Sequence, residues 1–132
     1  MKSLANFIAQ SASFNTDSTF TVFKGGITEL QAPAFPSFVQ LALMTYLELT
    51  HEEANDLVEL QIRISHEQVG EIVPPIRQPL NVKIMRPDRP IYVSSVAQLN
   101  LIFPAPGKMT FETAINKISL PLLYVYGNLV PS

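Results

Sequence analysis

Alternation of apolar and polar residues is the strongest pattern in this chain. Between residues 57 and 65 every second position is apolar, which places four side chains on one face of an extended strand: Val58, Leu60, Ile62 and Ile64. A helix would scatter the same residues around its circumference, whereas a strand aligns them. Residues 108–115 repeat the alternation. Both segments therefore predict strands with one face in a core and the other in water.

A turn signal precedes the second of these strands. Residues 97–103 also alternate, and the link from there to residue 108 reads Pro104-Ala105-Pro106-Gly107. Pro-Gly favours a type II turn, because proline sets the first central residue and glycine supplies the positive φ of the second. Two alternating segments around such a turn predict a hairpin with Gly107 at positive φ.

Two segments are apolar on both faces, residues 38–49 and 118–125. We interpret 38–49 as a central strand, although its alanine, leucine and methionine content also permits a helix. Pro121 places 118–125 at a sheet edge or bulge. A strand on the outside of a sandwich should alternate. A loop, such as the proline-rich segment 73–90, or another subunit must therefore cover the second face.

The remaining predicted elements are short. Strands are expected at Leu4–Gln10, Thr19–Phe23, Val69–Val73, Val82–Met85 and Ile91–Val93, and the proline-rich middle should form loops and short edge strands. Thr50-His51-Glu52-Glu53 has the spacing of a capping box and predicts one short helical turn. The whole pattern predicts an all-β fold, a predominantly antiparallel β-sandwich with one short helical turn, in a single domain spanning residues 1–132.

Composition narrows the partners that we expect. Charged residues make up 15% of the chain, against about 25% in typical soluble proteins, and the net charge is −2. This balance disfavours nucleic acid, which normally requires a basic patch. There is no cysteine and no apolar run of about 18 residues. We expect a cytoplasmic protein with no membrane partner.

The densest group of possible metal ligands is His51, Glu52, Glu53 and Asp56. Adjacent residues on one helical turn point in different directions, and no calcium-loop spacing accompanies them. A solvated first turn is therefore the favoured interpretation. His66 with Glu67 could form a general base, but a nucleophile would have to converge on them. We expect His66 to face water at a turn.

Other candidate groups also have simpler interpretations. Ser13, Ser94 and Ser95 lie in no Gly-x-Ser-x-Gly context. Gly25-Gly26 has too few glycines for a phosphate loop, and a tight turn or bulge explains the pair.

Tyr46, Tyr92, Tyr124 and Tyr126 could stack on sugars, but we expect their rings to be buried or half-buried in apolar strands. The sequence thus assigns no catalytic, cofactor-binding or metal-binding residue and implies no cofactor.

Some segments are similar to an uncharacterised family of small bacterial proteins. They are Leu4-Ala5-Asn6-Phe7, the stretch from Phe20 to Thr28, Phe35-Pro36, and the stretch from Phe103 to Phe111. The resemblance implies a β-sandwich and a bacterial, cytoplasmic origin. The family has no assigned activity, so the resemblance carries over no functional residue.

Three functions remain open. The leading hypothesis is a non-catalytic interaction or assembly module that binds another protein or forms a homo-oligomer, most simply a dimer, through one of the two-sided apolar strands. Leu123 in the 118–125 segment is a test residue for that contact. The second hypothesis is a β-sandwich that binds a small ligand or carbohydrate and presents exposed tyrosines. The third is a hydrolase in which His51 or His66 meets a carboxylate and a hydroxyl.

Overall fold

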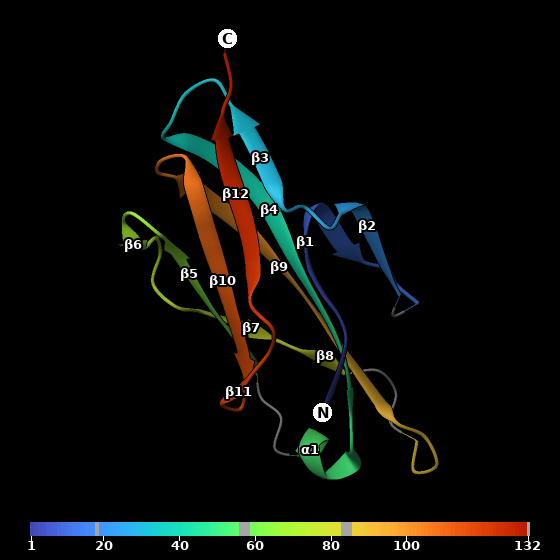
Figure 1. Ribbon diagram of the computed structural model, residues 1–132. Helices are drawn as coiled ribbons and strands as arrows, with labels where there is room; N and C mark the ends of the chain where they lie inside the picture. The colour runs from blue at the N-terminus through green and yellow to red at the C-terminus, as the bar shows by residue number, and fades with distance from the viewer. Residues whose placement is uncertain (18, 56–58, 83–85, 132) are drawn as a thin grey trace.

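The computed structural model describes residues 1–17, 19–55, 59–82 and 86–131, and it confirms the all-β fold (Figure 1). Two sheets pack face to face. Sheet A has the strand order β2 (Phe20–Gly25), β1 (Lys2–Phe14), β4 (Ser37–Leu49), β9 (Ile91–Phe103) and β8 (Asn81–Val82). Sheet B has the order β3 (Glu29–Ala32), β12 (Leu123–Leu129), β10 (Gly107–Ile115), β5 (Glu59–His66) and β6 (Gly70–Glu71). Two further strands join sheet B, β11 (Ile118–Ser119) beside β10 and β7 (Ile76–Pro79) beside β5. The pairing is antiparallel except between β12 and β3, which are parallel.

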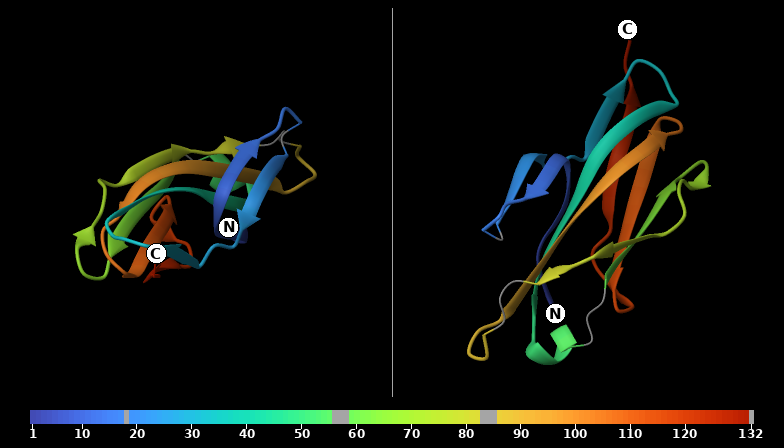
Figure 2. Two further views of the ribbon diagram at one scale, coloured as in Figure 1. Left: turned by 90° about the horizontal axis from the view of Figure 1, so that it is seen from above. Right: turned by 180° about the vertical axis from the view of Figure 1, so that it is seen from behind.

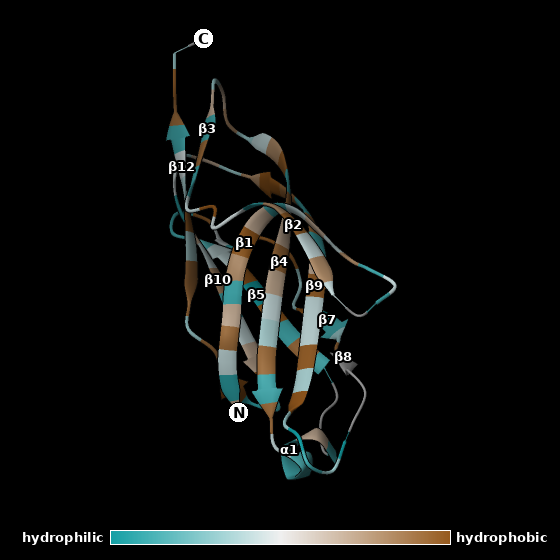
Figure 3. Ribbon diagram, turned by 90° about the vertical axis from the view of Figure 1, so that its right-hand side faces the viewer, coloured by the Kyte–Doolittle hydropathy of each residue, from teal (hydrophilic) through white to brown (hydrophobic). Residues whose placement is uncertain are grey.

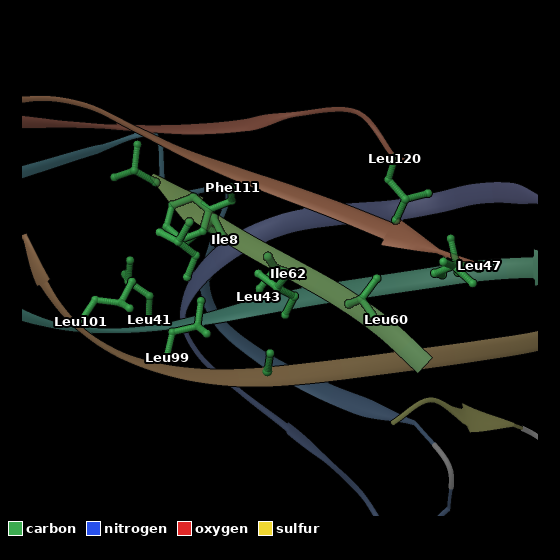
Figure 4. Packing of buried hydrophobic residues seen from close by; sticks show 14 of the residues in the cluster. Ile8, Leu41, Leu43, Leu47, Leu60, Ile62, Leu99, Leu101, Phe111 and Leu120 are labelled. Carbon is green, nitrogen blue, oxygen red and sulfur yellow. The ribbon is translucent and has the colours of Figure 1, made fainter. Parts of the chain in front are cut away.

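The main core lies between the sheets (Figure 4). The alternating residues of β5 form its clearest part, since Leu60, Ile62 and Ile64 are all fully buried. Leu43 and Phe111 meet them from β4 and β10, and both are also fully buried. Each such side chain stabilises the fold by about 1.5–3 kcal/mol relative to an exposed one. The period-two pattern of β5 therefore predicts correctly which of its faces packs in the core.

The segment 38–49 is a central strand, as predicted. β4 pairs with β1 on one side and with β9 along its whole length on the other (Figure 3). Its second apolar face is partly covered by the same chain, because Ala42 and Met44 form a small separate cluster against which Phe20 and Val22 of β2 pack. The Gln98 side-chain amide donates to the Ala12 carbonyl at 2.7 Å. The β1–β2 hairpin thus folds over part of the outer face of sheet A.

The hairpin predicted around residues 104–107 is wrong. β9 pairs with β4 and β8 in sheet A, whereas β10 pairs with β5, β11 and β12 in sheet B. Residues 104–106 cross between the sheets. The predicted positive φ of Gly107 is confirmed at 125°. The glycine conformation was therefore predicted correctly, but it does not determine whether the flanking strands become partners.

The segment 118–125 is two strands rather than one. β10 and β11 form a tight hairpin through Asn116 and Lys117, which have φ of 48° and 70°. The strand then breaks before β12 begins. Leu123 and Val125 of β12 contribute to the core, so the main core covers the face that we assigned to a loop or a subunit.

The proline-rich middle forms short edge strands, as predicted. β7 pairs with the outer side of β5, and β8 pairs with β9. Two further expectations need correction: residues 91–103 form one continuous strand, and the strand predicted at 69–73 is only the two residues of β6. Residues 83–85 of the predicted strand Val82–Met85 lie outside the described residues.

The predicted capping box is confirmed at the start of α1 (His51–Asn55). The Glu53 carboxylate accepts a hydrogen bond from the Thr50 backbone N–H at 2.9 Å, and the Glu53 N–H donates to the Thr50 hydroxyl at 3.2 Å. The Met1 amine donates to the other Glu53 carboxylate oxygen at 2.7 Å. These contacts fix a helix that is too short to be stable alone.

The Glu53 contacts predict a pH dependence. The hydrogen bond from the Met1 amine, followed by the hydrogen bond from the Thr50 backbone, lowers the pKa of Glu53 below its ordinary value of 4.5. A lowered folded-state pKa contributes stability above the unfolded-state pKa, and that stability is lost as the pH falls through the folded value. We expect Glu53→Gln to lower the melting temperature at neutral pH. The difference from the wild type should shrink on acidification below pH 4.5, and a difference that is constant with pH would contradict the assignment.

Candidate functional site

The possible metal ligands around α1 that the structure describes do not form a metal site. His51 Nε2 lies 3.0 Å from the Arg89 carbonyl, and the Glu53 carboxylate is engaged by Met1 and Thr50. Asp56 lies outside the described residues. His51 and Glu53 border an open cavity of about 510 Å³ at the α1 end of the sandwich. Within the described ranges, no group of three or more His, Cys, Asp or Glu residues could hold a metal ion.

His66 is buried, at 2% exposed, so the prediction that it faces water is wrong. Its Nε2 lies 3.0 Å from the Ala105 carbonyl, and its Nδ1 accepts the Gln68 backbone N–H at 3.1 Å. The Nε2 atom therefore carries the proton. His66 continues the inward alternation of β5 by one position beyond Ile64, and this parity is the sequence signal that could have revealed its burial.

The remaining candidates for nucleophilic or phosphate chemistry lie apart. Ser94 and Ser95 are buried, whereas Ser13 is exposed. The exposed Glu67 carboxylate accepts the Lys108 backbone N–H at 3.0 Å. In the described parts of the chain, neither histidine ring is hydrogen-bonded to a serine hydroxyl.

The Gly25-Gly26 pair forms a bulge against β1, which is one of the two interpretations drawn from the sequence, rather than a tight turn. Gly26 has φ of 80°, and the N–H groups of Gly26 and Ile27 both donate to the Ile8 carbonyl at 2.8 Å.

The four tyrosines divide into two pairs. Tyr46 and Tyr92 stack at 6.0 Å between ring centroids and are half-buried, as expected. Tyr124 and Tyr126 are 38% and 46% exposed, so the expectation of buried or half-buried rings is wrong for them. They occupy the outward positions of β12, because Val125 between them is fully buried.

An uncharged apolar patch lies on the outer face of sheet A, at the end where β4 begins and β9 finishes. Phe38 is 64% exposed, and Ile102, its direct partner in the register, is 58% exposed. The next outward pair is Gln40 and Asn100, both exposed. These four residues are called the apolar patch below. The two-sided apolar character of residues 38–49 was the sequence signal for it.

A second exposed surface covers the outer face of sheet B. It carries Tyr124 and Tyr126 together with outward polar side chains of β10 and β5, and we call it the tyrosine face. Sequence reasoning missed it, because the partners of β12 and β10 could not be deduced from local patterns. The sequence indicated a two-sided apolar strand and exposed tyrosines as possible contact surfaces, but it did not identify these particular faces.

The fold and these surfaces define a two-sheet β-sandwich with two contrasting exposed faces. More specifically, the chain belongs to a family of unknown function, DUF6941, which it matches over residues 4–120. Comparison with curated proteins gave no match, and neither did comparison with solved structures. The described part of the chain contains no helix with the length and apolarity needed to cross a bilayer.

Proposed function

We propose that this chain is a non-catalytic assembly module that forms a homodimer through the apolar patch. The observation that carries the proposal is the exposure of Phe38 and Ile102 side by side on a regular sheet. The β1–β2 hairpin covers Ala42 and Met44 farther along β4. Phe38 and Ile102 remain uncovered at the end of the same outer face.

The absence of charge from the apolar patch favours a second copy of the chain as the partner. In a two-fold dimer the same patch meets itself, so a charged patch would face like charge. The apolar patch contains two large apolar side chains and two amides, and no ionised group. Amides can donate and accept, so Gln40 and Asn100 can pair across a two-fold axis. This arrangement is self-complementary.

The histidine geometry supports a binding role over hydrolysis. Both His66 ring nitrogens are engaged with backbone groups in the interior, and the His51 ring is engaged with the Arg89 carbonyl. A general base needs a free nitrogen within reach of the nucleophile. We also propose a cytoplasmic location. The chain contains no cysteine, so it needs no disulfide and can fold in a reducing compartment.

Sedimentation velocity at micromolar concentration tests the dimer. We expect the wild type to sediment at twice the monomer mass and Phe38→Asp to sediment as a monomer, because the substitution places two carboxylates against each other at the interface. Ile118→Asp is the matched control. Ile118 is 49% exposed and lies at the opposite end of the sandwich (Figure 1), so this variant should remain dimeric.

Two results would contradict the proposal. A monomeric wild type removes the dimer, and a dimer that Phe38→Asp leaves intact removes the apolar patch as its interface. Far-UV circular dichroism of both variants should match the wild type, since both positions are exposed.

A further inference from the structure

We propose that the tyrosine face is a binding site for a neutral oligosaccharide. This site lies on sheet B, on the opposite layer from the apolar patch (Figure 2), and the inference is independent of the proposed dimer. The register of β12, β10 and β5 brings the side chains of this site together.

The pairing of β12 with β10 places the aromatic side chains of β12 beside polar side chains of β10. Tyr124 and Tyr126 are outward residues of β12, and the exposed Leu122 directly precedes that strand. Tyr126 lies opposite Lys108 and Tyr124 opposite Thr110 on β10. The Lys108 ammonium lies 5.0 Å from the centroid of the Tyr124 ring. This contact restrains the ring and reduces the entropy that a ligand would otherwise have to remove.

Hydrogen-bonding groups continue the face across β10 and β5. Thr110 lies opposite Ser65, and Glu112 lies opposite Arg63. The guanidinium supplies only donors, the carboxylate only acceptors, and the hydroxyls both. Arg63 and Glu112 occupy paired register positions and carry opposite charges, so this part of the surface does not select an ion of either sign. Such a set suits a ligand whose hydroxyls donate and accept.

A hollow lies where β5, β10 and β11 come together, next to the polar residues of this face and bordered by neither tyrosine. A cavity of about 250 Å³ is bordered by Gln61, Arg63, Glu112, Ser119 and Leu122. This volume is slightly below the range of pockets that hold drug-sized ligands, and it suits one small cyclic unit. Arg63 and Glu112 border the hollow and also belong to the polar residues of this face. A sugar ring in the hollow would therefore continue into units that lie along the face.

The chemistry of a pyranose matches this layout. One side of the ring presents C–H groups that pack on an aromatic face, and the rim presents hydroxyls. Tyr124 and Tyr126 lie two residues apart on one strand, so successive sugar units could contact them in turn. The polar groups of β10 and β5 then face the rim. An anion would be opposed by Glu112, and a cation would be opposed by Arg63 and Lys108.

Titration with cellotetraose, maltotetraose and chitotetraose, followed by NMR, tests the site. We expect at least one of the three at millimolar concentration to shift the ring resonances of Tyr124 and Tyr126. Tyr46 and Tyr92 lie in sheet A and serve as internal controls that should not shift. Tyr124→Ala should weaken binding by about tenfold, the loss expected for one aromatic contact, and Tyr124→Phe should retain it.

The variants also separate this site from the dimer interface. Phe38→Asp should bind the oligosaccharide as tightly as the wild type, whatever its sedimentation mass. Absence of shifts with all three oligosaccharides overturns the proposal, as do shifts confined to Tyr46 and Tyr92. If no oligosaccharide binds and Tyr124→Ala changes the sedimentation mass, the face is a protein contact and the proposal is also overturned.

Discussion

Gly127→Ala is expected to lower the free energy of unfolding by about 2–3 kcal/mol, as overpacking of a filled core does. A Cβ at this position on β12 would lie 2.6 Å from Cε1 and 2.8 Å from Cζ of Phe103. The Phe103 ring is 1% exposed and is held by edge contacts with Phe35 and His66, so it has no space into which to move. Chemical denaturation measures the loss.

Two further variants identify the cause of that loss. Gly70→Ala is the control, because Gly70 has φ of 85° and a Cβ there would meet no atom within 4 Å. It should lose only about 1 kcal/mol through backbone strain. Phe103→Leu should recover part of the stability of Gly127→Ala, because the smaller side chain removes the clash. If the two losses simply add, the clash with Phe103 is not the cause.

His66→Phe is expected to cost about 2 kcal/mol although the two side chains have similar volume. The substitution leaves the Ala105 carbonyl without its donor and the Gln68 N–H without its acceptor, and each loss is unfavourable because both contacts are partly buried around a buried ring. These two contacts tie together the turn after β5 and the crossing between the sheets. Thermal and chemical denaturation should both show the decrease.

His51→Phe is the matched control for this prediction. His51 also has a ring nitrogen within hydrogen-bond distance of a backbone carbonyl, that of Arg89, but the contact is exposed. Water can replace an exposed partner, so the change should stay within about 0.5 kcal/mol. Equal effects of the two substitutions would show that burial of His66 does not stabilise the fold.

The sequence predicts those parts of the structure that depend on neighbours along the chain. The β5 strand follows from the alternation of Leu60, Ile62 and Ile64, and the start of α1 follows from the spacing of Thr50 and Glu53. The positive φ of Gly107 follows from the Pro-Gly pair. In each case the pattern and the structure involve the same few residues.

The features that sequence reasoning missed depend on distant partners. Residues 97–103 and 107–115 look like a hairpin because each segment alternates. In the structure, however, β9 pairs with β4 and β10 pairs with β5. Local alternation determines which residues face a core but not which strand lies alongside. The tyrosine face also depends on distant partners, since the pairing of β12, β10 and β5 brings its side chains together.

His66 and Phe38 are two residues whose environment the sequence indicated only in part. The parity of β5 places His66 inward, but its position next to a turn led us to expect water. The apolar outer face of residues 38–49 led us to expect a contact there. The β1–β2 hairpin covers Ala42 and Met44, while Phe38 remains 64% exposed. This remainder is the basis for the proposed dimer.

Cysteine cross-linking tests the proposed interface most directly, because the chain contains no cysteine of its own. In a two-fold dimer through the apolar patch, Ile102 of one copy lies close to Ile102 of the other. Ile102→Cys should therefore form a covalent dimer under mild oxidation, provided that the two Cα atoms lie within about 7 Å, or with a short bismaleimide if they are farther apart. Ile118→Cys, treated in the same way, should remain monomeric on a denaturing gel. Absence of a covalent dimer from Ile102→Cys with both reagents, or equal cross-linking of the two variants, would contradict assembly through the apolar patch.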